Sequence, residues 1–162
     1  LQPARGATIF GDRRFVGLLS VTTVVSYFLL LTGSFVTRSG ASLACPSFPL
    51  CGSSAPAMRR LIDIQMLHRF TAYSIAALTV VLVIWLLARQ DSQRLKRYAV
   101  VLAALLLVQL GLGVSNVLLR LPMWSRVLHL AVAATFWVSL VVLWTLCCTG
   151  KRVPGATPSS PD

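Results

Sequence analysis

One stretch of the chain, residues 62–88, reads IDIQMLHRFTAYSIAALTVVLVIWLLA, and beyond Arg69 it contains no charged side chain. A helix of this length can cross the roughly 30 Å hydrocarbon core of a bilayer. Because lipid offers no hydrogen-bond partners, a spanning segment must satisfy its own backbone groups, which favours a helix over an open strand. The stretch is therefore predicted to be a transmembrane helix, and it sets the fold class.

Three further apolar blocks of similar length lie around this stretch, at about residues 15–36, 98–119 and 127–148. They belong to a chain of 162 residues that is 56% hydrophobic, with a mean hydropathy of +0.78. Short connections predict an all-α fold, a four-helix transmembrane bundle of up-down-up-down topology over residues 15–150. Residues 1–14 would form an N-terminal arm, and the Pro- and Ser-rich tail 151–162 is expected to be disordered.

The formal net charge of +11 would suggest nucleic-acid binding in a soluble protein. Here the basic side chains lie beside apolar blocks, where they control topology, so the predicted partner is the lipid bilayer and not a nucleic acid. Nine lie beside the termini and the middle connection: Arg5, Arg13, Arg14, Arg89, Arg94, Lys96, Arg97, Lys151 and Arg152. Five lie on the opposite side: Arg38, Arg59, Arg60, Arg120 and Arg126. This bias predicts that both termini are cytoplasmic.

Runs of small residues precede the second and the fourth block. Residues 31–36 read LTGSFV and residues 110–114 read LGLGV, and each run is followed by a block with a histidine near its start. Small residues allow transmembrane helices to pack closely. The two runs also indicate a weak internal duplication, in which the second helical hairpin repeats the first.

His68 and His129 are the two histidines of the chain. His68 lies about 20 residues before Ala88 and His129 about as far before Cys148, so both are expected at the same depth, near the outer boundary. The second and fourth helices of such a bundle can be diagonal partners, and two facing imidazoles can hold an iron porphyrin. Haem ligation is therefore the favoured hypothesis. A non-haem metal site normally needs more ligands, and a structural role for the histidines stays open.

Haem propionates need cations, and three arginines are candidates. Arg69 adjoins His68, Arg126 lies one turn before His129, and Arg38 ends the first block. Arginine can bind a propionate through two parallel hydrogen bonds. The alternative is that these side chains extend to lipid headgroups.

Cys45 and Cys51 bracket the loop sequence CPSFPLC, residues 45–51. Prolines stiffen this turn, and the compartment outside the membrane permits oxidation, so a disulfide is expected. It could staple the loop, or it could be a redox pair, and both interpretations stay open. The spacing is not Cys-x-x-Cys, which argues against a thioredoxin-type enzyme. Cys147 and Cys148, at the other membrane face, are expected to be free, packed thiols.

These stretches resemble the haem A synthase family. The similar residues are 32–52, 65–69 (QMLHR), 110–117 and 128–134, which together touch all four predicted helices. Family members typically have eight transmembrane helices in two similar halves, each with a histidine pair. They oxidise the C8 methyl of haem o to a formyl group, giving haem A, with haem b as cofactor. The resemblance implies that His68 and His129 form one such pair and that the protein resides in a bacterial-type plasma membrane.

The sequence departs from the family in two respects. It corresponds to one four-helix half, and it has Gln65 three residues before His68, where the substrate-binding half has a glutamate. An amide cannot serve as a general base. Two functions therefore stay open: a half-size haem A synthase, acting as a homo-oligomer or with partner membrane subunits, or a non-catalytic haem b subunit of a larger respiratory or photosynthetic membrane complex. A thiol oxidoreductase is a third, weaker possibility.

Overall fold

The computed structural model describes residues 12–51, 56–89 and 92–149. This part of the chain forms four long helices joined by turns and two short 3₁₀ helices, which confirms the all-α prediction. The predicted tail 151–162 and most of the predicted arm 1–14 lie outside the described residues.

Each helix is longer than its apolar block. The helices are α1 (Arg13–Arg38), α2 (Arg59–Arg89), α3 (Gln93–Leu118) and α4 (Met123–Thr149). All four are long and apolar enough to span a membrane. Arg94, Lys96 and Arg97, expected in a loop, lie instead in the first turns of α3. Long basic side chains can extend from a helix end into the headgroup region, so a helix need not stop where the hydrocarbon core ends.

Helix α1 begins at Arg13, inside the predicted arm 1–14, because Asp12 caps its first turn. The Asp12 carboxylate accepts hydrogen bonds from the backbone N–H groups of Arg14 at 2.9 Å and Phe15 at 3.4 Å. This cap satisfies donors that would otherwise lack partners at the first turn. The helix therefore begins at Arg13.

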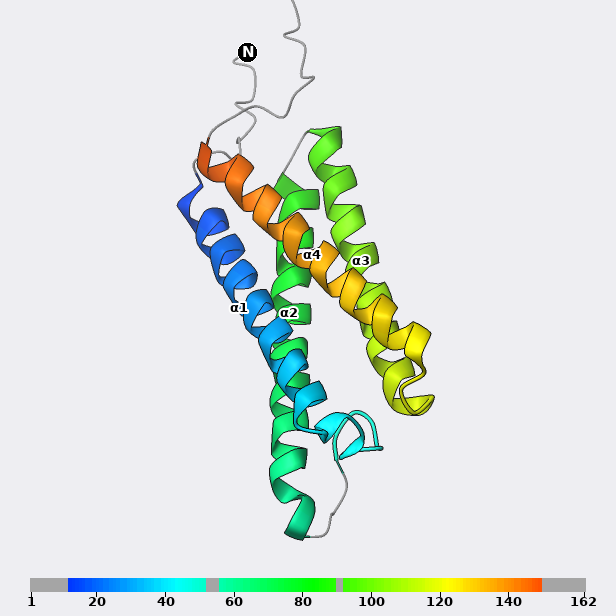
Figure 1. Ribbon diagram of the computed structural model, residues 1–162. Helices are drawn as coiled ribbons and strands as arrows, with labels where there is room; N and C mark the ends of the chain where they lie inside the picture. Colours follow the sequence, from blue (N-terminus) through cyan, green and yellow to red (C-terminus); the bar gives the residue numbers. More distant parts are fainter. Residues whose placement is uncertain (1–11, 52–55, 90–91, 150–162) are drawn as a thin grey trace, which may run out of the picture.

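The helices form a closed ring of neighbours. Helix α1 packs against α2 and α4, and α3 packs against α2 and α4, so α2 and α4 are diagonal partners as predicted. One end of the bundle carries the α2–α3 connection, and the other carries the loop after α1 and the α3–α4 turn (Figure 1). The topology is thus up-down-up-down.

The apolar core lies in the half of the bundle nearer the chain termini. Its fully covered side chains come from all four helices: Phe15, Leu19, Leu82, Leu86, Ala99, Leu102 and Leu140. In the opposite half, no residue of α3 between 107 and 118 is buried, and between 123 and 135 of α4 only Ser125 is. The histidines lie in this second half, where α2 contributes the buried side chains Ile62, Gln65 and Arg69.

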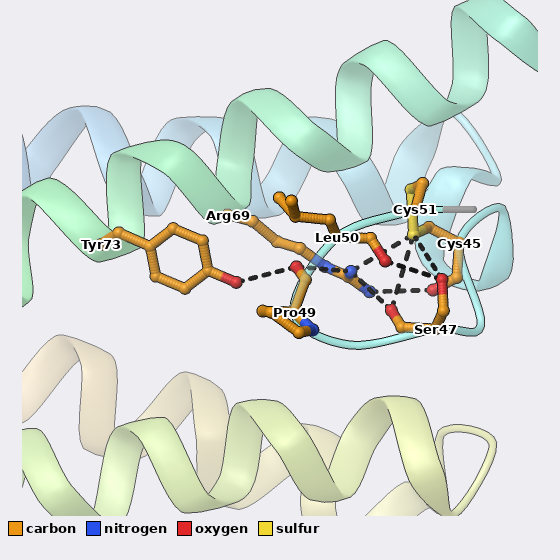
Figure 2. The surroundings of a disulfide bond; sticks show 7 residues. All are labelled: Cys45, Ser47, Pro49, Leu50, Cys51, Arg69 and Tyr73. Atoms are coloured by element: carbon orange, nitrogen blue, oxygen red, sulfur yellow. Dashed lines mark hydrogen bonds between the residues drawn. A yellow bond between two sulfur atoms is a disulfide. The ribbon is translucent and has the colours of Figure 1, made fainter. Parts of the chain in front are cut away.

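Two turns close the end that carries the histidines. Gly40, with φ of 75°, follows α1 and leads into the 3₁₀ helix η1 (Ala41–Leu43). A second 3₁₀ helix, η2 (Pro56–Met58), leads into α2. The loop 39–51 lies between α2 and the α3–α4 hairpin (Figures 1 and 2). It therefore stands at the mouth of the bundle.

Candidate haem site

His68 is held by two residues of the neighbouring helix α1. Its Nδ1 lies 3.1 Å from Thr32 Oγ1, and the Thr32 hydroxyl donates its one proton to the Leu29 carbonyl at 3.0 Å. When the Thr32 proton goes to the Leu29 carbonyl, the hydroxyl oxygen accepts from His68 Nδ1–H. In that tautomer Nε2 keeps its lone pair, the form that binds a metal.

Gly33 lies directly against the same imidazole. A Cβ built on Gly33 would stand 3.1 Å from His68 Cε1, which is closer than side chains normally tolerate. Any larger residue would displace the ring. Sequence analysis identified Thr32 and Gly33 for helix packing but not for contact with the histidine.

His129 occupies an equivalent position in the second hairpin. Gly113 of α3 lies against its ring, with a built Cβ 3.4 Å from Cε1. The Gln109 amide nitrogen lies 3.3 Å from His129 Nε2. When this nitrogen donates, Nε2 carries the lone pair, as in the His68 tautomer described above. In the described part of the chain, His129 Nδ1 and Gln109 Oε1 are buried without a hydrogen-bond partner. Binding of iron at Nε2 would displace the amide.

The two hairpins repeat the same arrangement of glycine and histidine. Gly33 of α1 faces His68 of α2, and Gly113 of α3 faces His129 of α4. The two histidines lie on the diagonal helices α2 and α4, and each imidazole contacts a glycine of the preceding helix. This arrangement supports the weak internal duplication.

The surroundings of the histidines fit a haem. Ile75 and Phe136, each two turns below its histidine, are buried at 2% and 5% exposure and give the site an apolar floor. Among residues 12–51, 56–89 and 92–149, no three His, Cys, Asp or Glu side chains gather as a metal site would require. Two imidazoles on diagonal helices above an apolar floor match the donor set of bis-histidine haem.

Arg69 has partners that sequence analysis did not foresee. Its guanidinium donates to the carbonyls of Ser47 at 2.7 Å, Cys45 at 2.8 Å and Pro49 at 3.2 Å, and lies 3.2 Å from Cys45 Sγ (Figure 2). The Tyr73 hydroxyl also donates to the Pro49 carbonyl at 2.9 Å. Arg69 is 6% exposed. It therefore fastens the loop to the helix that carries His68, and its proposed contact with a propionate stays a prediction.

The other candidate residues are placed as follows. Arg38 and Arg126 are exposed near the histidine end, and their proposed contact with a propionate stays a prediction. Cys45 and Cys51 form the expected disulfide, with their Cα atoms 5.3 Å apart. Cys147 is a buried free thiol as expected, whereas Cys148 is exposed because it lies on the outer face of α4.

Gln65 and Gln109 are polar side chains inside the bundle. Gln65 is 5% exposed, and its Oε1 has no hydrogen-bond partner among the described residues. Gln109 was missed by sequence analysis, although an isolated amide within an apolar block indicates a polar contact inside the bundle. Buried polar groups in a bilayer are costly unless they find partners, which makes both amides candidates for contact with a ligand.

The loop contacts lead to a prediction about Arg69 and Tyr73. Arg69→Gln removes several charge-assisted hydrogen bonds, about 3 kcal/mol, and should accelerate amide hydrogen exchange in residues 45–51 by roughly 100-fold. Tyr73→Phe removes one neutral hydrogen bond, about 1 kcal/mol, and should accelerate it roughly fivefold. Exchange measured by mass spectrometry on oxidised protein tests both values. Equal effects of the two variants would contradict the central role of Arg69.

Comparison with known proteins identifies the family of the chain. Residues 2–141 match the family COX15-CtaA, described as cytochrome oxidase assembly protein. Heme A synthase of Shouchella clausii is 33% identical over 140 residues, covering 85% of this chain and 44% of the relative. Heme A synthase of Symbiobacterium thermophilum is 34% identical over 119 residues, 70% of this chain and 38% of the relative.

A third relative carries another name. Protoheme IX farnesyltransferase of Haloarcula marismortui is 32% identical over 102 residues, covering 63% of this chain and 22% of that protein. The chain thus spans less than half the length of each of these curated relatives. The extent of the family match and of the synthase similarity nevertheless decides the assignment: this four-helix chain belongs to the COX15-CtaA family of cytochrome oxidase assembly proteins.

Proposed function

We propose that the bundle binds haem b between His68 and His129 as axial ligands. The observation that carries the proposal is the repeated arrangement in which each imidazole is backed by a glycine and has one polar partner on the same neighbouring helix. Bound haem would supply an iron centre that accepts and donates electrons. Arg38 and Arg126, exposed at the same end, are the proposed propionate partners, with Arg69 as a further candidate.

The chain's own residues would orient and shield the group. The Thr32 hydroxyl fixes the His68 tautomer, and the paired glycines let the helices approach the ring edges. Ile75 and Phe136 provide an apolar floor, and the loop fastened by Arg69 stands at the open end. Exclusion of water by these groups strengthens electrostatic interactions inside the site.

We further propose that the protein acts in haem A formation, by oxidising the C8 methyl of haem o to a formyl group. Family membership and the names of the synthase relatives support this activity. The farnesyltransferase relative contains a segment like this chain, which supports a farnesylated haem as substrate. The chain spans under half the length of its synthase relatives, so the proposed activity rests on the family and on the residues of this half.

Gln65 favours a second candidate, a non-catalytic haem b subunit of a larger membrane complex. The amide is buried one turn outward from His68 and cannot exchange a proton as a carboxylate does. A homo-oligomer would carry the same amide in every copy, so it could not supply a glutamate at this position. In both candidates the protein is an integral membrane protein of a bacterial-type plasma membrane with cytoplasmic termini.

Haem analysis separates the two candidates. If the protein is a synthase, its co-expression with a haem O synthase yields haem A among the extracted haems, and chromatography with mass spectrometry detects the mass change of the formyl product. If acid–base chemistry at position 65 limits the reaction, Gln65→Glu raises the yield by about 100-fold. A folded protein that retains haem b but forms no haem A in either version would support the non-catalytic subunit.

A further inference from the structure

The two histidines are held at different ring nitrogens. Thr32 Oγ1 lies 3.1 Å from Nδ1 of His68, whereas the Gln109 amide nitrogen lies 3.3 Å from Nε2 of His129. In both hairpins the polar partner comes from the helix that precedes the histidine's own helix. The hairpins therefore share a glycine against each ring but differ in the nitrogen that a neighbouring side chain engages.

This difference matters because Nε2 is the nitrogen that faces away from the backbone. Thr32 engages the other nitrogen of His68, so its contact can persist while His68 Nε2 binds a metal. Gln109 engages His129 at Nε2 itself. An amide can donate to this nitrogen or accept from it, so Gln109 competes with a metal for Nε2 in either neutral tautomer of the ring.

The contact between Gln109 and His129 lies inside the bundle. Gln109 is one turn before Gly113 on α3, so both residues contact the same imidazole. In the part of the chain that the structure describes, Gln109 Oε1 and His129 Nδ1 are buried and have no other hydrogen-bond partner. Because hydrocarbon offers no replacement partners, the amide and the ring are expected to stay together until a stronger ligand separates them.

We propose that Gln109 makes His129 the exchangeable axial ligand of the site, whereas His68 is the fixed one. The inference rests on the proposed binding of haem between the two histidines. His129 must break its hydrogen bond to Gln109 before its Nε2 can bind iron, and His68 keeps its bond to Thr32. When His129 leaves the iron, the Gln109 amide holds the released imidazole. The vacated position is then open to a small neutral donor, such as carbon monoxide.

The proposal predicts opposite effects for the two polar partners. Only protein molecules in which His129 is free of Gln109 can complete the site, and the apparent haem affinity falls by the fraction of such molecules. Gln109 should therefore weaken haem binding. Thr32 should strengthen it, because its hydroxyl orients the His68 ring without occupying Nε2. Gln109 is thus a positioning residue, and it acts through His129.

Haem titration of the purified protein in detergent, followed by absorbance, tests the first effect. Gln109→Leu should bind haem about fivefold more tightly, the factor expected when one competing hydrogen bond is removed. Gln109→Met, which has another shape, should show the same gain, whereas a packing effect would separate the two variants. Gln93→Leu makes the same change at an exposed position of α3 and should match the wild type.

Several outcomes of the titration would overturn the proposal. Unchanged or weaker binding in both apolar variants, or a gain in only one of them, would show that Gln109 does not compete for His129. If the wild type and all variants bind no haem, the proposed function fails as well. If the wild type binds haem with a low-spin spectrum and the affinities do not change, the failure belongs to this inference alone.

Binding of carbon monoxide to the reduced, haem-loaded protein tests the exchange directly by stopped-flow absorbance. The wild type should bind carbon monoxide about fivefold faster than Gln109→Leu, because the same hydrogen bond delays the return of His129 to the iron. Gln93→Leu should again match the wild type. A purely structural role of Gln109 would not couple tighter haem binding to slower entry of carbon monoxide. Equal or faster entry in Gln109→Leu would overturn the assignment of His129 as the exchangeable ligand.

Discussion

Replacing either histidine with alanine is expected to abolish stable haem binding. Each variant removes one of two proposed axial nitrogen donors, and loss of an outer partner alone typically lowers metal affinity by roughly 10–100-fold. We therefore expect His68→Ala and His129→Ala each to weaken haem binding by more than about 100-fold. The pyridine haemochrome spectrum of purified protein measures the bound haem and also identifies its type.

A matched variant separates ligation from orientation. Thr32→Val keeps His68 but removes the hydroxyl that accepts from Nδ1, and should lower haem affinity by roughly 10–100-fold while preserving a low-spin bis-histidine spectrum. Formation of the Cys45–Cys51 disulfide and an unchanged helical circular dichroism spectrum serve as controls for folding. If both alanine variants retained the low-spin spectrum, the assignment of the histidine pair would be wrong.

Filling the space at Gly33 is expected to have the second largest effect. A Cβ at this position would already lie 3.1 Å from His68 Cε1, so Gly33→Leu must push the imidazole away from its present position. Overpacking of this kind costs about 1–3 kcal/mol for modest additions, or roughly five- to 150-fold in an equilibrium constant. We expect Gly33→Leu to lose haem almost as completely as His68→Ala, and Gly33→Ala to lower haem affinity about fivefold.

The other glycines supply graded controls for this experiment. Gly113→Ala meets His129 Cε1 at 3.4 Å and should weaken haem binding less than Gly33→Ala does. Gly111→Ala and Gly17→Ala meet no atom within 4 Å and should leave haem binding unchanged. Because alanine favours helix more than glycine does, lower helix propensity cannot explain a loss of haem. Haem titration followed by absorbance gives the order, and a loss in Gly111→Ala equal to that in Gly33→Ala would contradict the role of the ring contact.

Much of the architecture could be predicted from the pattern of apolar residues. Four long apolar blocks predict four spanning helices, because hydrocarbon leaves the backbone no other way to satisfy its hydrogen bonds. The matched depth of His68 and His129 follows from the fixed rise of a helix. The spacing of Cys45 and Cys51 in an outer loop was enough to predict the disulfide, which the structure contains.

The helix ends and the loop contacts could not be predicted in the same way. The length of an apolar block marks the part of a helix inside the hydrocarbon core, but caps and long basic side chains decide where the helix begins and ends. Asp12 caps the start of α1 in this way. The partners of Arg69 lie about 20–24 residues away in sequence, so its neighbour His68 suggested a haem contact instead. The hydrogen bonds of Thr32 and Gln109 likewise join side chains of different helices.

By itself, the sequence determined the four long apolar helices and the place of each histidine along its helix, because hydropathy and helical rise are local properties of the chain. Only the tertiary structure decided that glycines back both imidazoles, that Thr32 and Gln109 are their polar partners, and that a buried guanidinium lies against Cys45 Sγ. These features depend on how helices rotate about their axes and how a loop folds back on them. The packing between distant segments sets the helix rotations and the path of the loop. The spacing of residues in the sequence does not reveal that packing.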